Sequence, residues 1–432
     1  MFRIQSLSSL EILDSRGRPT LKTTCRLESG ASASASVPSG ASTGAAEARE
    51  LRDGDPSRYR GLGCRQATSN VSGPIRSAIT GVSFASQAEL DQRLIELDGT
   101  SDKSRLGANA ILSVSIAFAR AAAAQREKPL FQHMADLAGT SCSTLPRPTI
   151  NLFSGGKHAG GQAPIQDVLI VPSGARSMDE ALALTFAIYL AAAELCAKKY
   201  SMRLLRADEG GLAPPFTRAA AMMEDAIAAI EAAGFAPGRD VHLAVDLASS
   251  HFYSEHHYHL DGRQLTSLEM IEVLEGWIRD YPVVSIEDGL AEEDWEHWPL
   301  LTKSVGDRAL VVGDDLLCTQ PNRIQRAVQA RAASGLLLKV NQVGSLSEAM
   351  EARQAALTAG WEVTVSARSG ETEDDWLADL AVGFNAGQIK IGSITQSERL
   401  AKYNRLLAIE TETGFKLASW PNKPVSSAKV CR

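Results

Sequence analysis

The sequence predicts an α/β protein in which a β/α barrel is preceded by a smaller N-terminal α+β domain. The main observation is a series of apolar runs in the second half of the chain, each typical of a buried strand that ends on a charged residue. These ends follow one another at intervals of 41, 27, 25, 29 and 22 residues, and all but the first interval fit one strand, one helix and two loops. Repeated units of this kind close into a barrel with catalytic groups at the strand C-termini. The strand-end residues are Asp246, Glu287, Asp314, Lys339, Arg368 with Ser369, and Lys390.

Patterns in the first 136 residues predict the α+β domain. An alternating segment, LKTTCRLES, predicts a half-buried strand, and VPSGASTG follows as a loop of small residues. Residues 66–136 show helical patterns rich in Ala and Leu. Their most apolar stretch, ANAILSVSIAFARAAAA, is interrupted by polar residues and is too short and too polar to span a bilayer. We expect it to form a buried helix between the domains.

A change in pattern near residue 140 predicts the domain boundary. The segment STLPRPTINLFSGGKHAGG contains two prolines and a cluster of glycines. From there to about residue 410 strands and helices alternate. We therefore assign residues 1–136 to the N-terminal domain and residues 137–432 to the catalytic barrel.

Composition indicates a soluble enzyme rather than a nucleic-acid-binding or membrane protein. The chain has 44 basic and 51 acidic residues, a net charge of −7, and no basic tail or stripe. Its N-terminus lacks the continuous apolar segment of a signal peptide. The six cysteines are scattered and form no CxxC pair, which favours free thiols in a reducing cytoplasm.

Three acidic strand ends predict a metal site. Asp246, Glu287 and Asp314 belong to successive strands, so their carboxylates should converge at the barrel mouth. Mg²⁺ prefers oxygen ligands and binds through few carboxylates together with substrate oxygens. A single acid at a strand end is more often a helix cap, but three in series followed by cationic residues favour a metal site.

The cationic strand ends predict a base and an anion site. Lys339 follows three leucines, and a neutral amine beside metal ions and Lys390 could accept a proton. The alternative is a structural ion pair between Lys339 and Asp314. Arg368, Ser369 and the following helical pattern combine a guanidinium, a hydroxyl and backbone amides, which suits a phosphate.

Two glycine-rich segments supply further candidates. Glu209 lies in DEGGLAP, where adjacent glycines suggest close approach to a ligand, so this acid could hold or deliver a proton. His158 lies in SGGKHAGG and could reach a phosphate. The later segment HFYSEHHYH could be a zinc site, but the Asp261-Gly262 turn favours a solvated hairpin.

Many collinear motifs make the chain resemble the enolase family of phosphopyruvate hydratases over nearly its whole length. They are DSRGRPT, VPSGASTG, RLGANAILSVSIA, SGGKHAGG, DEGGLAP, SIEDG, VGDDL, LLLKVNQVGSL, RSGETED and GQIKIGS.

The resemblance implies an enolase-type barrel and a role for each matching residue. Asp246, Glu287 and Asp314 match the first Mg²⁺ site, and Ser42 matches the loop serine that ligates a second Mg²⁺ arriving with substrate. The other matches are Lys339 as base, Glu209 as acid, Arg368 with Ser369 as phosphate grip, Lys390 facing the substrate carboxylate and His158 near the phosphate. The implied reaction removes the α-proton of a 2-phosphoglycerate-like substrate and eliminates water. The family also implies a homodimer or higher homo-oligomer, with Arg16 and the N-terminal strands near the contact.

Three departures from the family pattern bear on the substrate. Ala367 stands where the family has His, Asp167 where it has Glu, and Arg18 where Asn is usual. A smaller pocket wall beside an intact metal site suits a bulkier or differently charged substrate. One alternative is therefore an enzyme similar to carboxyphosphonoenolpyruvate synthase, which belongs to phosphonate biosynthesis and acts on a carboxyphosphono analogue. Another is a weakly catalytic binding or scaffold protein, which the intact Lys339 and Glu209 disfavour.

Overall fold

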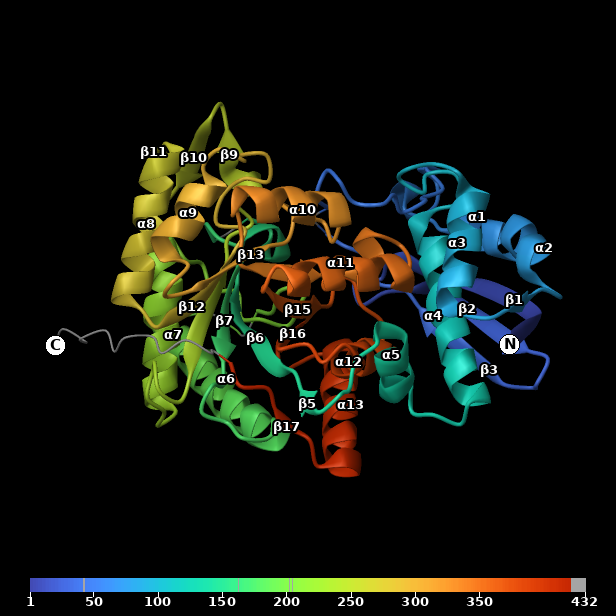
Figure 1. Cartoon of the computed structure of the whole chain (residues 1–432). Coiled ribbons are helices and arrows are strands. Elements are labelled where there is room, and N and C mark those ends of the chain that lie inside the picture. Colours follow the sequence, from blue (N-terminus) through green and yellow to red (C-terminus); the bar gives the residue numbers. More distant parts are fainter. Residues whose placement is uncertain (42, 162, 202, 204, 421–432) are drawn as a thin grey trace.

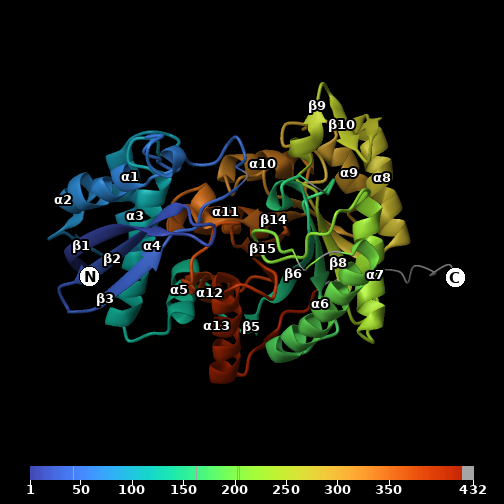
Figure 2. The same cartoon turned by 180° about the vertical axis from the view of Figure 1, so that it is seen from behind.

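The computed structural model describes residues 1–41, 43–161, 163–201, 203 and 205–420, and consists of an N-terminal domain beside a barrel (Figures 1 and 2). Ser42, which the resemblance makes a metal ligand, lies outside the described residues. The N-terminal domain contains an antiparallel sheet with the strand order β3-β2-β1-β4. Its strands are β1 (Phe2–Leu13), β2 (Pro19–Leu27), β3 (Ser32–Ser36) and β4 (Ser83–Phe84).

Helices cover this sheet and join it to the barrel. They are α1 (Arg65–Asn70), α2 (Arg76–Ile79), α3 (Gln87–Asp98), α4 (Ala108–Gln125) and α5 (Leu130–Ala138). Helix α4 is buried over most of its length because it packs on β2 and β3 and also contacts barrel helix α11 (Leu346–Thr358). The Ser115 hydroxyl of α4 accepts a hydrogen bond from the Leu346 amide at 3.1 Å. The predicted helix between the domains is confirmed.

The barrel is closed, with the strand order β12-β13-β14-β15-β16-β6-β7-β8, which confirms the predicted fold class. Strand β7 runs antiparallel to both of its neighbours, whereas the other adjacent pairs are parallel. Because of this reversal the first residue of β7, Asp167, lies beside the last residues of β6 and β8, Ser154 and Asp246. The strands are β6 (Arg147–Ser154), β7 (Asp167–Val171), β8 (His242–Asp246), β12 (Val283–Glu287), β13 (Leu310–Gly313), β14 (Gly335–Leu338), β15 (Glu362–Ser366) and β16 (Gln388–Gly392).

An outer layer of helices surrounds the strands (Figure 1). The remaining helices are α6 (Met178–Tyr200), α7 (Ala219–Ala232), α8 (Ser267–Asp280), α9 (Trp298–Val305), α10 (Pro321–Ala330), α12 (Trp376–Gly383) and α13 (Ser397–Thr413). Among the described helices, α6 alone is long and apolar enough to pass a test for a membrane span, which is weak support for one. Since α6 packs on α7, α13 and β6, we assign it to the barrel's outer layer.

The histidine-rich segment after β8 forms a small sheet of β9 (Tyr253–Ser254), β10 (His257–Leu260) and β11 (Arg263–Leu265). Asp261 and Gly262 connect β10 to β11 with φ angles of 52° and 73°, as a tight hairpin turn requires. His257 Nδ1 lies 2.8 Å from the Glu255 carbonyl oxygen, and His259 Nε2 lies 3.0 Å from the Ser254 hydroxyl. The predicted hairpin is confirmed, and no histidine of this segment belongs to a potential metal cluster among the described residues.

Two short strands, β5 (Thr144–Leu145) and β17 (Lys416–Leu417), pair below the barrel and lead the chain to Trp420. The Trp420 side chain is buried and packs with Leu169, Val171, Ala244 and Val284 in a cluster separate from the main core. Trp420 therefore seals the barrel at the end opposite its mouth.

We expect Trp420→Ala to lower the free energy of unfolding by ~3–5 kcal/mol, because removing a buried indole loses its transfer energy and leaves a cavity. Urea denaturation measures the change. The matched control is Leu268→Ala, whose side chain is exposed and should matter by less than ~0.5 kcal/mol. Equal effects of the two substitutions would contradict the sealing role of Trp420.

Candidate active site

The strand ends of the barrel surround a small cavity. Of the residues predicted from the sequence, it brings together Glu209, Lys339, Asp246, Lys390 and His158, and also the three consecutive positions 367–369. Ala41, from the N-terminal domain, completes the lining next to Ser42. The small-residue loop of the first domain thus reaches the barrel mouth.

Lys390 occupies the centre of the carboxylates at this mouth. Its ammonium donates to Asp246 Oδ2 at 2.8 Å and to the two Glu287 oxygens at 2.8 and 2.7 Å. Burial alone would raise the pKa of Asp246, but Lys390 outweighs it and lowers this pKa to about 2. Burial and the negative charge of Asp246 raise the pKa of Glu287. One cation therefore neutralises a pair of carboxylates that cannot both be charged at low cost.

Lys339 donates in the same way to Asp314 Oδ2, the third predicted metal ligand. Burial favours its neutral form, but Asp314 outweighs burial and raises the Lys339 pKa. In this arrangement Lys339 forms the ion pair with Asp314 that was its alternative interpretation, and the neutral amine expected beside metal ions stays a prediction. Among the described residues the three predicted ligands do not together form one of the compact acidic clusters, and each of them bonds to a lysine.

The chemistry of these donors fits a hard divalent cation. All three acids stand at the ends of neighbouring strands, and the described carboxylate oxygens already bind positive charge. Asp288 holds the backbone next to these acids in place. Its carboxylate accepts hydrogen bonds from the Asp314 and Asp315 amides at 2.9 and 2.8 Å. Asp288, Asp314 and Asp315 form one of the compact acidic clusters.

Gln166 is a site residue that sequence reasoning missed. Its amide nitrogen donates to Asp246 Oδ2 at 3.0 Å, and its buried amide oxygen has no partner in the described part of the chain. The side chain lines the cavity, so this oxygen is available to a ligand. The sequence signal that could have identified Gln166 is its position directly before Asp167.

Arg368 and Ser369 form a positively charged corner of the cavity. Arg368 donates through both terminal nitrogens to the Glu47 carboxylate, at 2.9 and 3.2 Å. Burial lowers the Arg368 pKa, but Glu47 more than compensates. The sequence analysis also missed Glu47, which lies in the loop that contains Ala41 and pairs with a residue 321 positions later.

At the other end of the cavity, His158 bridges two acids. Its Nδ1 lies 3.1 Å from Asp167 Oδ2, and its Nε2 lies 3.8 Å from Glu209 Oε1. Burial would lower the His158 pKa, but Glu209 and Asp167 raise it to about 9, so the ring is an imidazolium. Asn151 donates to Glu209 Oε2 at 3.1 Å and so orients the carboxylate.

Asp167 differs from its expected place in the substrate pocket. It is fully buried behind His158, accepts a hydrogen bond from the Ser154 hydroxyl at 2.5 Å, and does not line the cavity. The short aspartate side chain is held between Ser154 and His158 and does not extend past the imidazole. Its influence on a ligand therefore passes through His158.

Comparison with known families accounts for both domains. Residues 4–134 match the family model described as enolase, N-terminal domain, and residues 142–423 match the one described as enolase, C-terminal TIM barrel domain. Together the two matches cover most of the chain, and their order agrees with the domains in Figure 1.

Replacing Asp246 tests the metal assignment. We expect Asp246→Asn to weaken Mg²⁺ binding by at least ~100-fold, more than the usual ~10–100-fold cost of losing a group that only supports a ligand. Isothermal titration with MgCl₂ measures the affinity. Glu293→Gln is the matched control, because that carboxylate is 63% exposed and should leave Mg²⁺ affinity unchanged. Wild-type affinity in Asp246→Asn would refute the assignment.

Proposed function

Because the chain belongs to the enolase family, we propose that it is a Mg²⁺-dependent hydro-lyase acting on a 2-phosphoglycerate-like substrate. The reaction would remove the proton α to a carboxylate and eliminate a β-hydroxyl as water, leaving an enolpyruvate product. The observation that supports it most is a single cavity lined by a lysine, Lys339, by an acid, Glu209, and by an anion grip, Arg368 with Ser369. These are the groups that the two bond-breaking steps require.

Asp246, Glu287 and Asp314 are the residues that would hold Mg²⁺. The bound metal supplies positive charge next to the substrate carboxylate, whose negative charge doubles when the α-proton leaves. Lys390 would face the same carboxylate and stabilise the same charge. A second Mg²⁺, with Ser42 as a ligand, remains part of the proposal as the family resemblance implies it.

Lys339 is proposed as the base. Its amine accepts the α-proton while the electron pair of the C–H bond moves towards the carboxylate. Asp314, and to a smaller extent Glu287, keep Lys339 charged, so engagement of both carboxylates by a metal would leave burial, Arg368 and Lys390 to lower the lysine pKa. A lysine base with Mg²⁺ in enolase-type sites is also a general pattern of this superfamily.

Glu209 and His158 are proposed as the acid. The C–O bond to the β-hydroxyl breaks as the stored electron pair forms the carbon–carbon double bond, and the hydroxyl leaves with a proton as water. His158 carries a proton and Glu209 is held ionised, since burial, which would raise the Glu209 pKa, is outweighed by His158. The pair therefore offers one transferable proton, and Asn151 orients the carboxylate.

A carboxyphosphono analogue of 2-phosphoglycerate is the second candidate substrate. Ala367 lines the cavity next to Arg368 and presents only a methyl group where the family has an imidazole. An additional carboxylate on the phosphorus would lie near this wall and within reach of positive charge. A third possibility, a binding protein with little catalysis, is disfavoured because every proposed proton-transfer residue is present.

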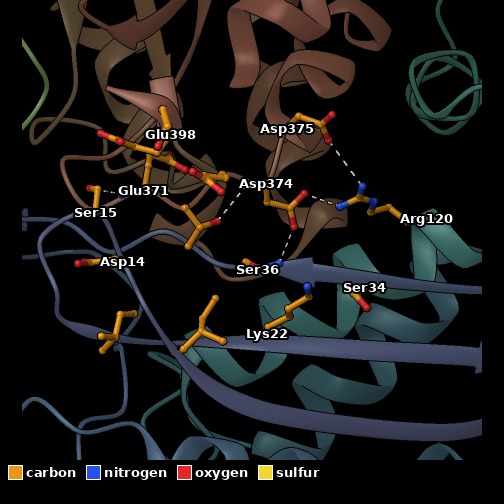
Figure 3. Close-up of a pocket in the computed structure, with 15 residues that line it drawn as sticks. Asp14, Ser15, Lys22, Ser34, Ser36, Arg120, Glu371, Asp374, Asp375 and Glu398 are labelled. Atoms are coloured by element: carbon orange, nitrogen blue, oxygen red, sulfur yellow. Dashed lines mark hydrogen bonds and ion pairs between the residues drawn. The ribbon is translucent and has the colours of Figure 1, made fainter. Parts of the chain in front are cut away.

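We further propose a cytoplasmic homodimer. The five described cysteines are free thiols, as expected in a reducing compartment. Strand β1 exposes Leu10 and Leu13 beside a cavity that lies between the N-terminal sheet and the barrel. Figure 3 shows Lys22 and the Arg120 ion pairs in this cavity. Charged side chains of a second copy could form ion pairs with these residues. Arg16 is not available for this contact, because its side chain is only 6% exposed and faces inwards.

Lys339→Ala tests the base. We expect the substitution to reduce exchange of the substrate α-proton in deuterated water by ~10²–10⁴-fold, the usual contribution of a positioned base. Proton NMR of 2-phosphoglycerate with Mg²⁺ follows the exchange. Lys303→Ala removes an exposed lysine and should exchange normally. Exchange in Lys339→Ala at the wild-type rate would assign the base to another group.

Restoring the family pair tests substrate choice. We expect Ala367→His with Asp167→Glu to raise turnover of 2-phosphoglycerate by about 10²-fold, because a donor near developing charge contributes that much. Turnover of the carboxyphosphono analogue should fall, since the added ring fills its space. Enol absorbance with each substrate gives both rates, and the two single variants serve as controls. Ordinary enolase rates in the unmodified protein, or no effect of the double substitution, would refute the proposal that the substrate is the carboxyphosphono analogue.

A further inference from the structure

The Ser369 hydroxyl accepts two hydrogen bonds from the N-terminal domain. The Ala41 amide donates to Ser369 Oγ at 2.7 Å, and Arg16 Nη1 donates to the same oxygen at 3.1 Å. A serine oxygen has two lone pairs and one proton. Both lone pairs are therefore in use, and the proton must be donated in another direction. No residue in the described part of the chain accepts it, and Ser369 lines the cavity.

The arginine that makes this contact is held rigidly. Arg16 Nε and Nη2 donate to Asp14 Oδ2 at 3.3 and 3.1 Å, and Nη2 also donates to the Ser39 carbonyl oxygen at 2.9 Å. Asp14 is fixed in turn by the Arg16 and Arg18 amides. The side chains of Arg16 and Asp14 are only 6% and 0% exposed, so the guanidinium has little freedom to turn away from Ser369.

Gly370 makes the approach possible. A Cβ at this position would lie 2.3 Å from Arg16 Nη2 and 2.3 Å from Asp14 Oδ2, which no real side chain tolerates. The Ser39 and Gly370 backbones also pair directly, with hydrogen bonds of 2.8 and 2.9 Å. The glycine after Ser369 therefore serves the contact with the first domain.

We propose that Arg16 is a positioning residue for anion binding, which directs the Ser369 proton into the cavity. The inference rests on the proposed function, in which Ser369 binds the anionic group of the substrate. Arg16 does not line the cavity, so it would act through the Ser369 hydroxyl and not by direct contact. An anion at the grip gains a donor whose orientation is set before it binds.

The test compares Arg16→Met, Ser369→Ala and the double variant in the full-length protein. Inorganic phosphate with MgCl₂ is the probe, and ³¹P NMR titration gives its affinity. We expect each single variant to bind phosphate about tenfold more weakly, the value of one hydrogen bond to a charged group. The double variant should match Ser369→Ala within about twofold, because Arg16 has nothing to orient once the hydroxyl is absent. With 2-phosphoglycerate, Arg16→Met should raise KM more than it lowers kcat.

Arg52→Met is the matched control. Arg52 donates to the Ser39 hydroxyl at 2.7 Å, so it contacts the same loop, but it does not contact Ser369. Its effect on phosphate affinity should stay within about twofold. Arg16→Lys keeps a cationic donor and should recover at least half of the lost binding free energy.

Independent effects of Arg16→Met and Ser369→Ala, or unchanged phosphate affinity in Arg16→Met, would overturn the inference. Should Arg16→Met fold poorly because Asp14 is left as an unpaired buried charge, Arg16→Met with Asp14→Asn removes that charge and is judged by the same comparison. A wild-type protein that binds phosphate but converts neither 2-phosphoglycerate nor its carboxyphosphono analogue would refute the proposed function alone. One that binds no phosphate would refute this inference.

Discussion

Balance of charge inside the barrel mouth is the constraint on which the rest of the structure depends. Asp246, Glu287 and Asp314 are nearly excluded from water, and so are the lysines that neutralise them. Leaving one such charge without its partner typically costs ~3–5 kcal/mol, a large part of the stability of an ordinary domain. Binding of a cation and an anion must therefore exchange partners within the site and cannot simply add charge to it.

The same constraint links the two ends of the cavity. At one end Lys390 and Lys339 bind carboxylates, and at the other His158 lies between Asp167 and Glu209. Each of these acids lies within 4 Å of a lysine or histidine nitrogen. A substrate that carries both a carboxylate and a second anionic group suits this division, since each group meets cationic side chains.

The period of the strand ends was enough to predict the barrel and the residues that gather at its mouth. The intervals between charged residues are a local property, and parallel strands bring equivalent ends together whatever the details of packing. Strand β7 does not follow this rule. It runs antiparallel to its neighbours, so its first residue, and not its last, lies at the mouth. That is why Gln166 was missed, whereas Asp167 was assigned to the pocket wall from the family resemblance alone.

Pairing between domains was also beyond the reach of sequence patterns. Glu47 and Arg368 are 321 residues apart, and nothing in the composition of either segment indicates the other. The charge state of Lys339 is beyond sequence patterns for a related reason. A pKa depends on which charges lie within a few ångströms, and the bond to Asp314 decided it.

Gly370 has a consequence for how this protein can evolve. Because it admits Arg16 and Asp14 to the rim of the barrel, the proposed anion grip is assembled from both domains of the chain. Recombination that replaced only the first 136 residues by those of a relative could retune anion affinity without changing a single barrel residue. An isolated barrel would keep its lysines and the acids proposed to bind metal, yet lack the Glu47 carboxylate that pairs with Arg368 and the guanidinium that contacts Ser369. The proposed anion site of this chain thus depends on contacts between the two domains.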